Sequence, residues 1–128
     1  MTIRVVRLGS PRAPDEGTRI GTVRRPPRGV PKADFAKENW YDVWLPILSP
    51  DPETVKLAQA ARTAAQWAAF GRHYRHEMAQ PDAARTLALL AALSHQTHFS
   101  VGCYCENEAH CHRSVLRELL REAGAAIE

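Results

Sequence analysis

The longest patterned stretch of the sequence is helical and lies between segments that are typical of β-strands. Residues 53–95 place apolar side chains at helical spacing, and Pro81 divides the stretch, which predicts two or three helices. The β-branched segments 3–8 and 18–23 precede it, and residues 98–104 follow it as a further strand. Helices between strands form the crossover connections that parallel strands need. The sequence therefore predicts an α/β fold with a small, mostly parallel sheet of three or four strands.

Segments rich in proline and glycine separate these elements. Residues 9–17 and 24–31 are predicted loops, and the second contains two adjacent prolines that lack backbone donors. The aromatic segment 40–45 fits either a strand or the end of a helix. Residues 112–123 predict a C-terminal helix with one apolar face. With 128 residues, the chain is expected to form one α/β domain, residues 1–128.

Positive charge is concentrated in the first quarter of the chain. Residues 1–32 contain seven arginines and Lys32 against Asp15 and Glu16, a balance of +6, whereas the remainder carries −3. This asymmetry favours an anionic partner, either a small molecule or a nucleic acid, although a solvated basic surface would give the same pattern. It leaves the oligomeric state undetermined.

The distribution of apolar residues and cysteines indicates a location. No run of about 18 apolar residues is present, so we expect no membrane-spanning segment. Charges interrupt the apolar N-terminus, unlike a secretory signal. The three cysteines all fall between positions 103 and 111, whereas a secreted disulfide scaffold usually has an even number. These features predict a cytoplasmic protein with a metal or thiol site.

The cysteines lie where the last predicted strand gives way to the last helix. Cys103 and Cys105 occupy the carboxyl end of the strand, and Cys111, His112 and Arg113 begin the helix. Ligands of open parallel sheets bind beyond the carboxyl ends of strands. A helix N-terminus also lowers the pKa of a nearby cysteine. We therefore predict Cys111, His112 and Cys103 as catalytic residues.

The same segment supports two kinds of sulfur chemistry. Cys103, Cys105 and Cys111 with His110 or His112 would form a Cys3His set for zinc or another transition metal. In the alternative, Cys111 is a nucleophile or redox thiol with Cys105 or Cys103 as its partner. A buried, inert Cys103 remains the simplest reading of that residue.

Arginines provide a third, compatible interpretation. Arg113 and the free N–H groups of the helix start are suited to a phosphate or carboxylate. Arg24, Arg25 and Arg28 would join Arg113 if the end of strand 18–23 lies beside the end of strand 98–104. Arg113, Arg24 and Arg28 are therefore the predicted substrate-binding residues.

Three motifs together resemble a known bacterial family, "domain of unknown function 488" (the YeaO-like proteins). They are the Cys/His segment Gly102–Leu116, the loop Arg24–Gly29 and the pattern Tyr74-x-x-Glu77-Met78. The family loop often reads Asp-Arg-x-Trp-Pro-Arg-Gly, and here Val23 replaces the acid and Pro26 the Trp. Cys105 stands where many members have Glu. The resemblance covers nearly the whole chain and implies a compact α/β domain, without an established reaction.

Three functions follow from these observations. An enzyme using the Cys/His/Arg segment on an anionic, phosphorylated or nucleotide-like substrate predicts a cleft with Cys111 at its base. A metal-binding or redox-sensing module predicts convergence of the three sulfurs without an open cleft. A nucleic-acid-binding module predicts arginines spread along one face. The enzyme ranks slightly ahead, because arginine and cysteine at a strand-to-helix loop together indicate a pocket.

Overall fold

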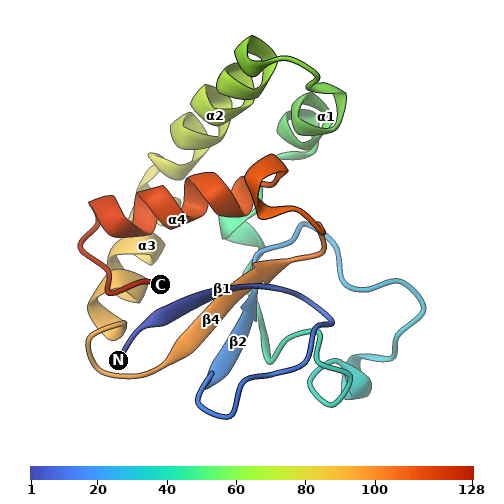
Figure 1. The fold of residues 1–128 in the computed structure, drawn as a ribbon, viewed down its shortest axis with the longest axis vertical. Coiled ribbons are helices and arrows are strands. Elements are labelled where there is room, and N and C mark those ends of the chain that lie inside the picture. Colours follow the sequence, from blue (N-terminus) through green and yellow to red (C-terminus); the bar gives the residue numbers. More distant parts are fainter.

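The computed structural model describes residues 1–128. It consists of a four-stranded parallel sheet with helices on one side (Figure 1). The strand order is β1 (Ile3–Arg7), β4 (Phe99–Cys103), β2 (Thr18–Gly21) and β3 (Val43–Trp44). All three strand pairs are parallel. Every residue of β4 is buried, as expected for a central strand between two parallel neighbours. The predicted α/β fold with a small parallel sheet is confirmed.

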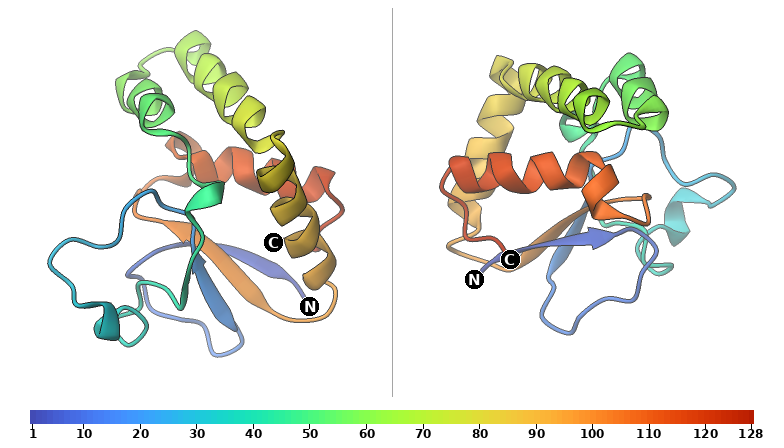
Figure 2. Two further views of the ribbon diagram at one scale, coloured as in Figure 1. Left: turned by 180° about the vertical axis from the view of Figure 1, so that it is seen from behind. Right: turned by 45° about the horizontal axis from the view of Figure 1, so that its top comes forward.

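The helical stretch divides into three helices, which together form the crossover between β3 and β4. They are α1 (Pro52–Ala60), α2 (Ala64–Met78) and α3 (Pro81–Leu93), and α4 (His112–Glu122) follows β4 (Figure 2). Proline occupies the first position of α1 and of α3, where its missing N–H has no helical partner to lose. A capping box between Thr63 and Gln66 begins α2. These local signals explain why the stretch breaks where it does.

The segment between β2 and β3 is mostly irregular and extends beside the sheet, away from the helices (Figure 2). A 3-10 turn occupies Lys32–Asp34. The aromatic segment 40–45 contributes the two-residue edge strand β3, so it is a strand rather than a helix end. Both residues of β3 are exposed, as an edge position allows.

Two apolar clusters stabilise the fold. The larger one lies between the sheet and the helices and includes the fully buried side chains of Phe70 and Tyr74 from α2 and Leu116 and Leu120 from α4. The helical periodicity of α2 therefore does mark a core face. The smaller one, here called the carboxyl-end cluster, consists of Leu8, Val23, Tyr41, Cys103 and Cys111. Its position beyond the carboxyl ends of β1, β2 and β4 places two of the three cysteines beside the region where parallel sheets bind ligands.

A buried ion pair fixes the loop that precedes β2. The Arg19 guanidinium, fully buried, donates to the Glu16 carboxylate at 2.7 and 2.9 Å and to the carbonyl oxygens of Ser10 and Asn39. Ser100 of β4 donates its hydroxyl to the same carboxylate at 2.7 Å. Although burial opposes ionisation, the hydrogen bonds from Arg19 and Ser100 lower the pKa of Glu16 from 4.5 to about 2. These residues are called the Glu16–Arg19 network below.

No helix in the structure combines the length and the apolar character needed to cross a membrane.

Candidate functional site

The carboxyl ends of β2 and β4 meet the first turn of α4. Gly21 pairs with Gly102, and both the backbone N–H and the hydroxyl of Thr22 donate to the Gly102 carbonyl, at 2.9 and 3.0 Å. Cys103 is the last residue of β4, and Cys111, in extended conformation, caps the N-terminus of α4. The chain leaves the sheet at Cys103 and returns beside it at Cys111.

Two thiols and an imidazole are in contact at this junction. The Sγ atoms of Cys103 and Cys111 are 2.7 Å apart, and Cys111 Sγ lies 3.7 Å from His112 Nδ1. All three residues are buried, and one ligand atom from each lies within 4.8 Å of the others. We call these residues the Cys103–Cys111–His112 cluster.

Thr22 defines the tautomer of His112. The Thr22 hydroxyl has one hydrogen, which it donates to the Gly102 carbonyl oxygen. It must therefore accept from His112 Nε2, which lies 3.1 Å away, so Nε2 carries the proton of the neutral imidazole. His112 Nδ1 is left as the acceptor, and its partner is the thiol of Cys111, a weak donor 3.7 Å away. Burial lowers the pKa of His112 to about 4, so the ring is neutral at pH 7.

Cys105 lies beside the cluster and is exposed. The thiols of Cys103 and Cys111, together with the charge of Arg113, lower the pKa of Cys105. Hydrogen bonding to Cys105 and Cys111, together with burial, raises the pKa of Cys103. Of these two thiols, the exposed one is therefore the more acidic.

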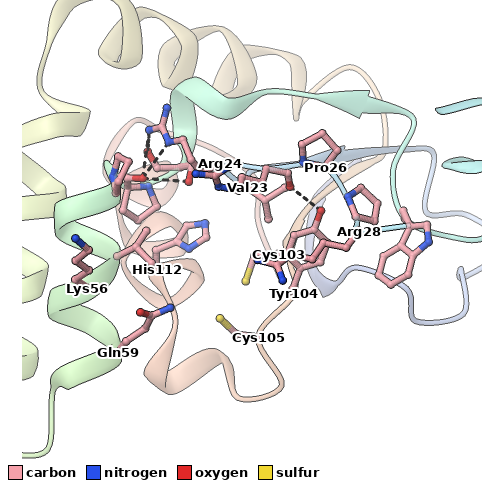
Figure 3. Close-up of a pocket in the computed structure, with 17 residues that line it drawn as sticks. Val23, Arg24, Pro26, Arg28, Lys56, Gln59, Cys103, Tyr104, Cys105 and His112 are labelled. Carbon is pink, nitrogen blue, oxygen red and sulfur yellow. Dashed lines mark hydrogen bonds between the residues drawn. The ribbon is translucent and has the colours of Figure 1, made fainter. Parts of the chain in front are cut away.

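A pocket of about 640 Å³ opens over the cluster (Figure 3). Cys103, Cys105 and His112 form part of its wall, together with the half-buried rings of Trp40 and Tyr104. Four basic side chains also line it, and its wall contains no carboxylate; the four are Arg24, Arg25, Arg28 and Lys56. The pocket therefore combines positive charge, aromatic surface, sulfur and imidazole.

The arginine-rich loop after β2 is held against the rest of the molecule at two points. The Arg24 guanidinium donates to the carbonyl oxygens of Ser49 and Pro50 at 3.1 and 3.2 Å, so this side chain has a structural role. The Tyr104 hydroxyl donates to the Arg25 carbonyl oxygen at 2.8 Å (Figure 3). The guanidinium groups of Arg25 and Arg28 are exposed at the pocket and pair with no carboxylate. They are therefore available to a ligand.

The predicted site residues are only partly brought together. Arg24 and Arg28 line the pocket, whereas Arg113 is buried behind it, where it donates to the Cys105 carbonyl oxygen at 2.7 Å and its Nε has no partner. Cys111 does not reach the pocket wall, so the expected cleft has Cys103 rather than Cys111 at its surface.

Only Cys111 separates the two candidate histidines in the sequence, yet their side chains lie in different places. His110 belongs to the 3-10 turn Glu108–His110, is exposed, and packs edge-on against Trp67 at 5.8 Å. His112 is the first residue of α4 and points inward to the thiols. Of the four metal ligands predicted from sequence, the structure brings Cys103 and Cys111 together, with His112 beside them, Cys105 nearby and His110 apart.

Sequence analysis missed Thr22, Lys56 and Gln59. Thr22 directly follows β2, so its place at the carboxyl end of a strand was a usable signal. Lys56 and Gln59 reach the pocket from α1, and nothing in their sequence context distinguishes them from ordinary exposed helix residues. The motif residue Glu77 has a structural role, because its carboxylate accepts the Asp51 N–H at 2.8 Å and the Thr54 hydroxyl at the start of α1.

Comparison with known proteins identifies a family. Residues 3–124 match the family model DUF488-N3a, described as "Active DUF488-N3 subclade". Neither a curated protein nor a solved structure matches the chain. The match covers both the arginine-rich loop and the cysteine segment, and the chain belongs to the DUF488 family.

Proposed function

We propose that the protein is an enzyme that acts on a phosphorylated, nucleotide-like anion bound in the pocket above the Cys103–Cys111–His112 cluster. One observation carries the proposal: four cations and no carboxylate line the same pocket as two thiols and an imidazole. The description of the matched subclade as active agrees with a catalytic role.

Charge and shape in the pocket support an anionic ligand. Arg25 and Arg28 offer planar guanidinium forks that suit phosphate oxygens, and they bring them from a loop anchored by Tyr104. Lys56 adds a point charge from α1, where its only carboxylate neighbour is the exposed Glu53 at 3.4 Å. A volume of about 640 Å³ exceeds what a single phosphate needs and falls within the range of small-molecule sites.

Aromatic surface beside the cations supports the nucleotide-like character of the ligand. The rings of Trp40 and Tyr104 pack edge-to-face at 5.9 Å, and both residues line the pocket. Aromatic faces stack on nucleobases. We therefore place the phosphate at the Arg25–Arg28 side and the planar portion of the ligand at Trp40.

The cluster supplies the reactive group in this proposal. Cys103 and His112 are on the wall, and Cys111 lies directly behind Cys103. Their burial keeps water from the sulfur and nitrogen atoms except through the pocket.

The other basic residues near the N-terminus do not favour the nucleic-acid alternative. Three of the arginines outside the pocket lie in ion pairs with carboxylates rather than along one free basic face; the pairs are Arg4–Asp15, Arg7–Glu106 and Arg12–Asp42. At the pocket, by contrast, Arg25 and Arg28 pair with no carboxylate, whereas Arg24 lies 3.4 Å from Asp51.

Calorimetric titration with pyrophosphate and with adenosine monophosphate tests the binding step. We expect both to bind the reduced protein, and Arg28→Gln and Lys56→Gln to weaken binding several-fold each. Arg85→Gln, on the exposed face of α3, is the matched control and should bind normally. Absence of binding, or equal weakening in the control, would contradict the proposal.

Turnover is tested by following a panel of phosphorylated nucleosides by phosphorus NMR. A compound that the wild type converts should remain unchanged with Cys103→Ser and with His112→Gln, while both variants still bind pyrophosphate. Conversion that continues in both variants would remove the cluster from the reaction.

A further inference from the structure

From the geometry of the cluster we infer that it is a zinc site, with Cys103 Sγ, Cys111 Sγ and His112 Nδ1 as ligands and a fourth position open to the pocket. Two thiols and a neutral imidazole nitrogen are a donor set that zinc prefers. Three protein ligands with one open position distinguish catalytic zinc sites from closed structural ones.

The distance between Cys111 Sγ and His112 Nδ1 already suits zinc, whereas the two sulfurs must move apart. With Zn–S near 2.3 Å and Zn–N near 2.0 Å, tetrahedral geometry separates a sulfur from a nitrogen ligand by about 3.5 Å and two sulfurs by about 3.8 Å. Cys111 Sγ and His112 Nδ1 are already 3.7 Å apart. The sulfurs of Cys103 and Cys111, at 2.7 Å, have to separate by about 1 Å.

The surroundings of His112 support ligation through Nδ1. Its Nε2–H is committed to Thr22, whose own hydrogen is committed to the Gly102 carbonyl. Metal-binding histidines usually donate their other ring N–H to a neighbouring acceptor, which fixes the tautomer and the ring orientation. The edge of the ring also packs on Tyr74, with centroids 5.6 Å apart. The lone pair of Nδ1 is therefore held on the cysteine side, where its partner in the structure is the weakly donating Cys111 thiol at 3.7 Å.

The structure also favours three protein ligands over four. Cys105 is exposed and lies outside the group of atoms within 4.8 Å of one another, and His110 packs against Trp67 instead. Cys103 and His112 both reach the pocket wall, so the fourth position faces the pocket. If an anion binds in the pocket as proposed above, a zinc ion at this position would polarise one of its oxygens. This part of the inference rests on the proposed function.

Metal analysis of the full chain, purified without chelator and with a phosphine reductant, tests the inference. We expect about one zinc per chain in the wild type, in Cys105→Ser and in His110→Gln. Zinc should be lost from Cys103→Ser, Cys111→Ser and His112→Gln, with circular dichroism confirming that each variant is folded.

Cobalt titration of the metal-free wild type provides a second measurement that does not depend on those variants. Tetrahedral coordination with two thiolates should give intense visible bands together with sulfur-to-cobalt charge transfer, and Cys105→Ser should give the same spectrum. A folded wild type that retains neither metal, or loss of zinc in Cys105→Ser or His110→Gln, would overturn the inference. Pyrophosphate binding that persists in metal-free protein would leave the proposed function standing, so the two failures are distinguishable.

Discussion

Two buried sets of polar side chains lie beside the central strand β4: the Glu16–Arg19 network and the Cys103–Cys111–His112 cluster. They differ in how completely their polar atoms are hydrogen-bonded within the protein. In the Glu16–Arg19 network, each nitrogen of the guanidinium donates to protein oxygen, and the carboxylate accepts from Arg19, Ser100 and the backbone of Ala13. In the Cys103–Cys111–His112 cluster, His112 Nδ1 has only a thiol as a neighbour, and the cluster faces a pocket.

The difference indicates separate roles. A buried group with all its hydrogen bonds made inside the protein stabilises one conformation and has nothing to offer a ligand. A buried group with spare lone pairs at a cavity costs stability and is retained where a ligand completes it. The first group therefore fixes the loop before β2, and the second one is the candidate site.

Removing the charge of Arg19 should have the largest effect on stability. Arg19→Met leaves the Glu16 carboxylate buried without its partner, which we expect to lower the free energy of unfolding by about 3–5 kcal/mol in urea denaturation. Arg85→Gln should change it by less than about 0.5 kcal/mol. A loss below about 1 kcal/mol with Arg19→Met would remove the structural role assigned to this network.

The same network predicts a pH dependence of stability. Because the pKa of Glu16 is lowered from 4.5 to about 2 in the fold, its contribution is complete above pH 4.5 and is lost as the pH falls through about 2. The shift corresponds to at most ~3 kcal/mol. Denaturation between pH 5 and pH 2 should show this loss in the wild type and a shallower slope in Glu16→Gln. Equal slopes in the two proteins would contradict the assignment.

Thr22→Val tests the role of the Cys103–Cys111–His112 cluster. The substitution keeps the shape of the side chain but removes the acceptor of His112 Nε2–H, so zinc affinity should fall about 10–100-fold, measured by competition with a chromophoric chelator. The corresponding energy is about 1.4–2.7 kcal/mol. An unchanged affinity would show that Thr22 does not orient the imidazole for a metal.

Tyr104→Phe should have the smallest effect. It removes the hydroxyl that binds the Arg25 carbonyl oxygen while retaining the ring beside Trp40. We expect pyrophosphate binding to weaken about threefold and stability to fall by about 1 kcal/mol or less, because one partly exposed hydrogen bond is lost. Binding as strong as in the wild type would indicate that the loop keeps its position without this contact.

The fold was predictable because its signals are local. The prolines at the starts of α1 and α3 and the apolar period of α2 are properties of neighbouring residues. The edge strand β3 was ambiguous, because two exposed residues carry no alternating pattern.

The site was only partly predictable, because its details depend on where each side chain points in the folded chain. Position at the end of β4 indicated the cysteine segment, yet sequence spacing cannot show that His112 turns inward while His110 turns out. It likewise cannot show that Arg113 donates to the Cys105 carbonyl oxygen, or that the Lys56 side chain of α1 lines the pocket. Each of these depends on packing between distant parts of the chain.

Thiol footprinting most directly tests whether an anion binds above the cluster. Cys105 is the exposed thiol of the pocket wall, so iodoacetamide should modify it first, with the products located by mass spectrometry. Pyrophosphate at a concentration near its wild-type dissociation constant should slow modification of Cys105 in the wild type and in Arg85→Gln, and should give less protection in Arg28→Gln. The same rate at Cys105 with and without pyrophosphate in the wild type would contradict the account.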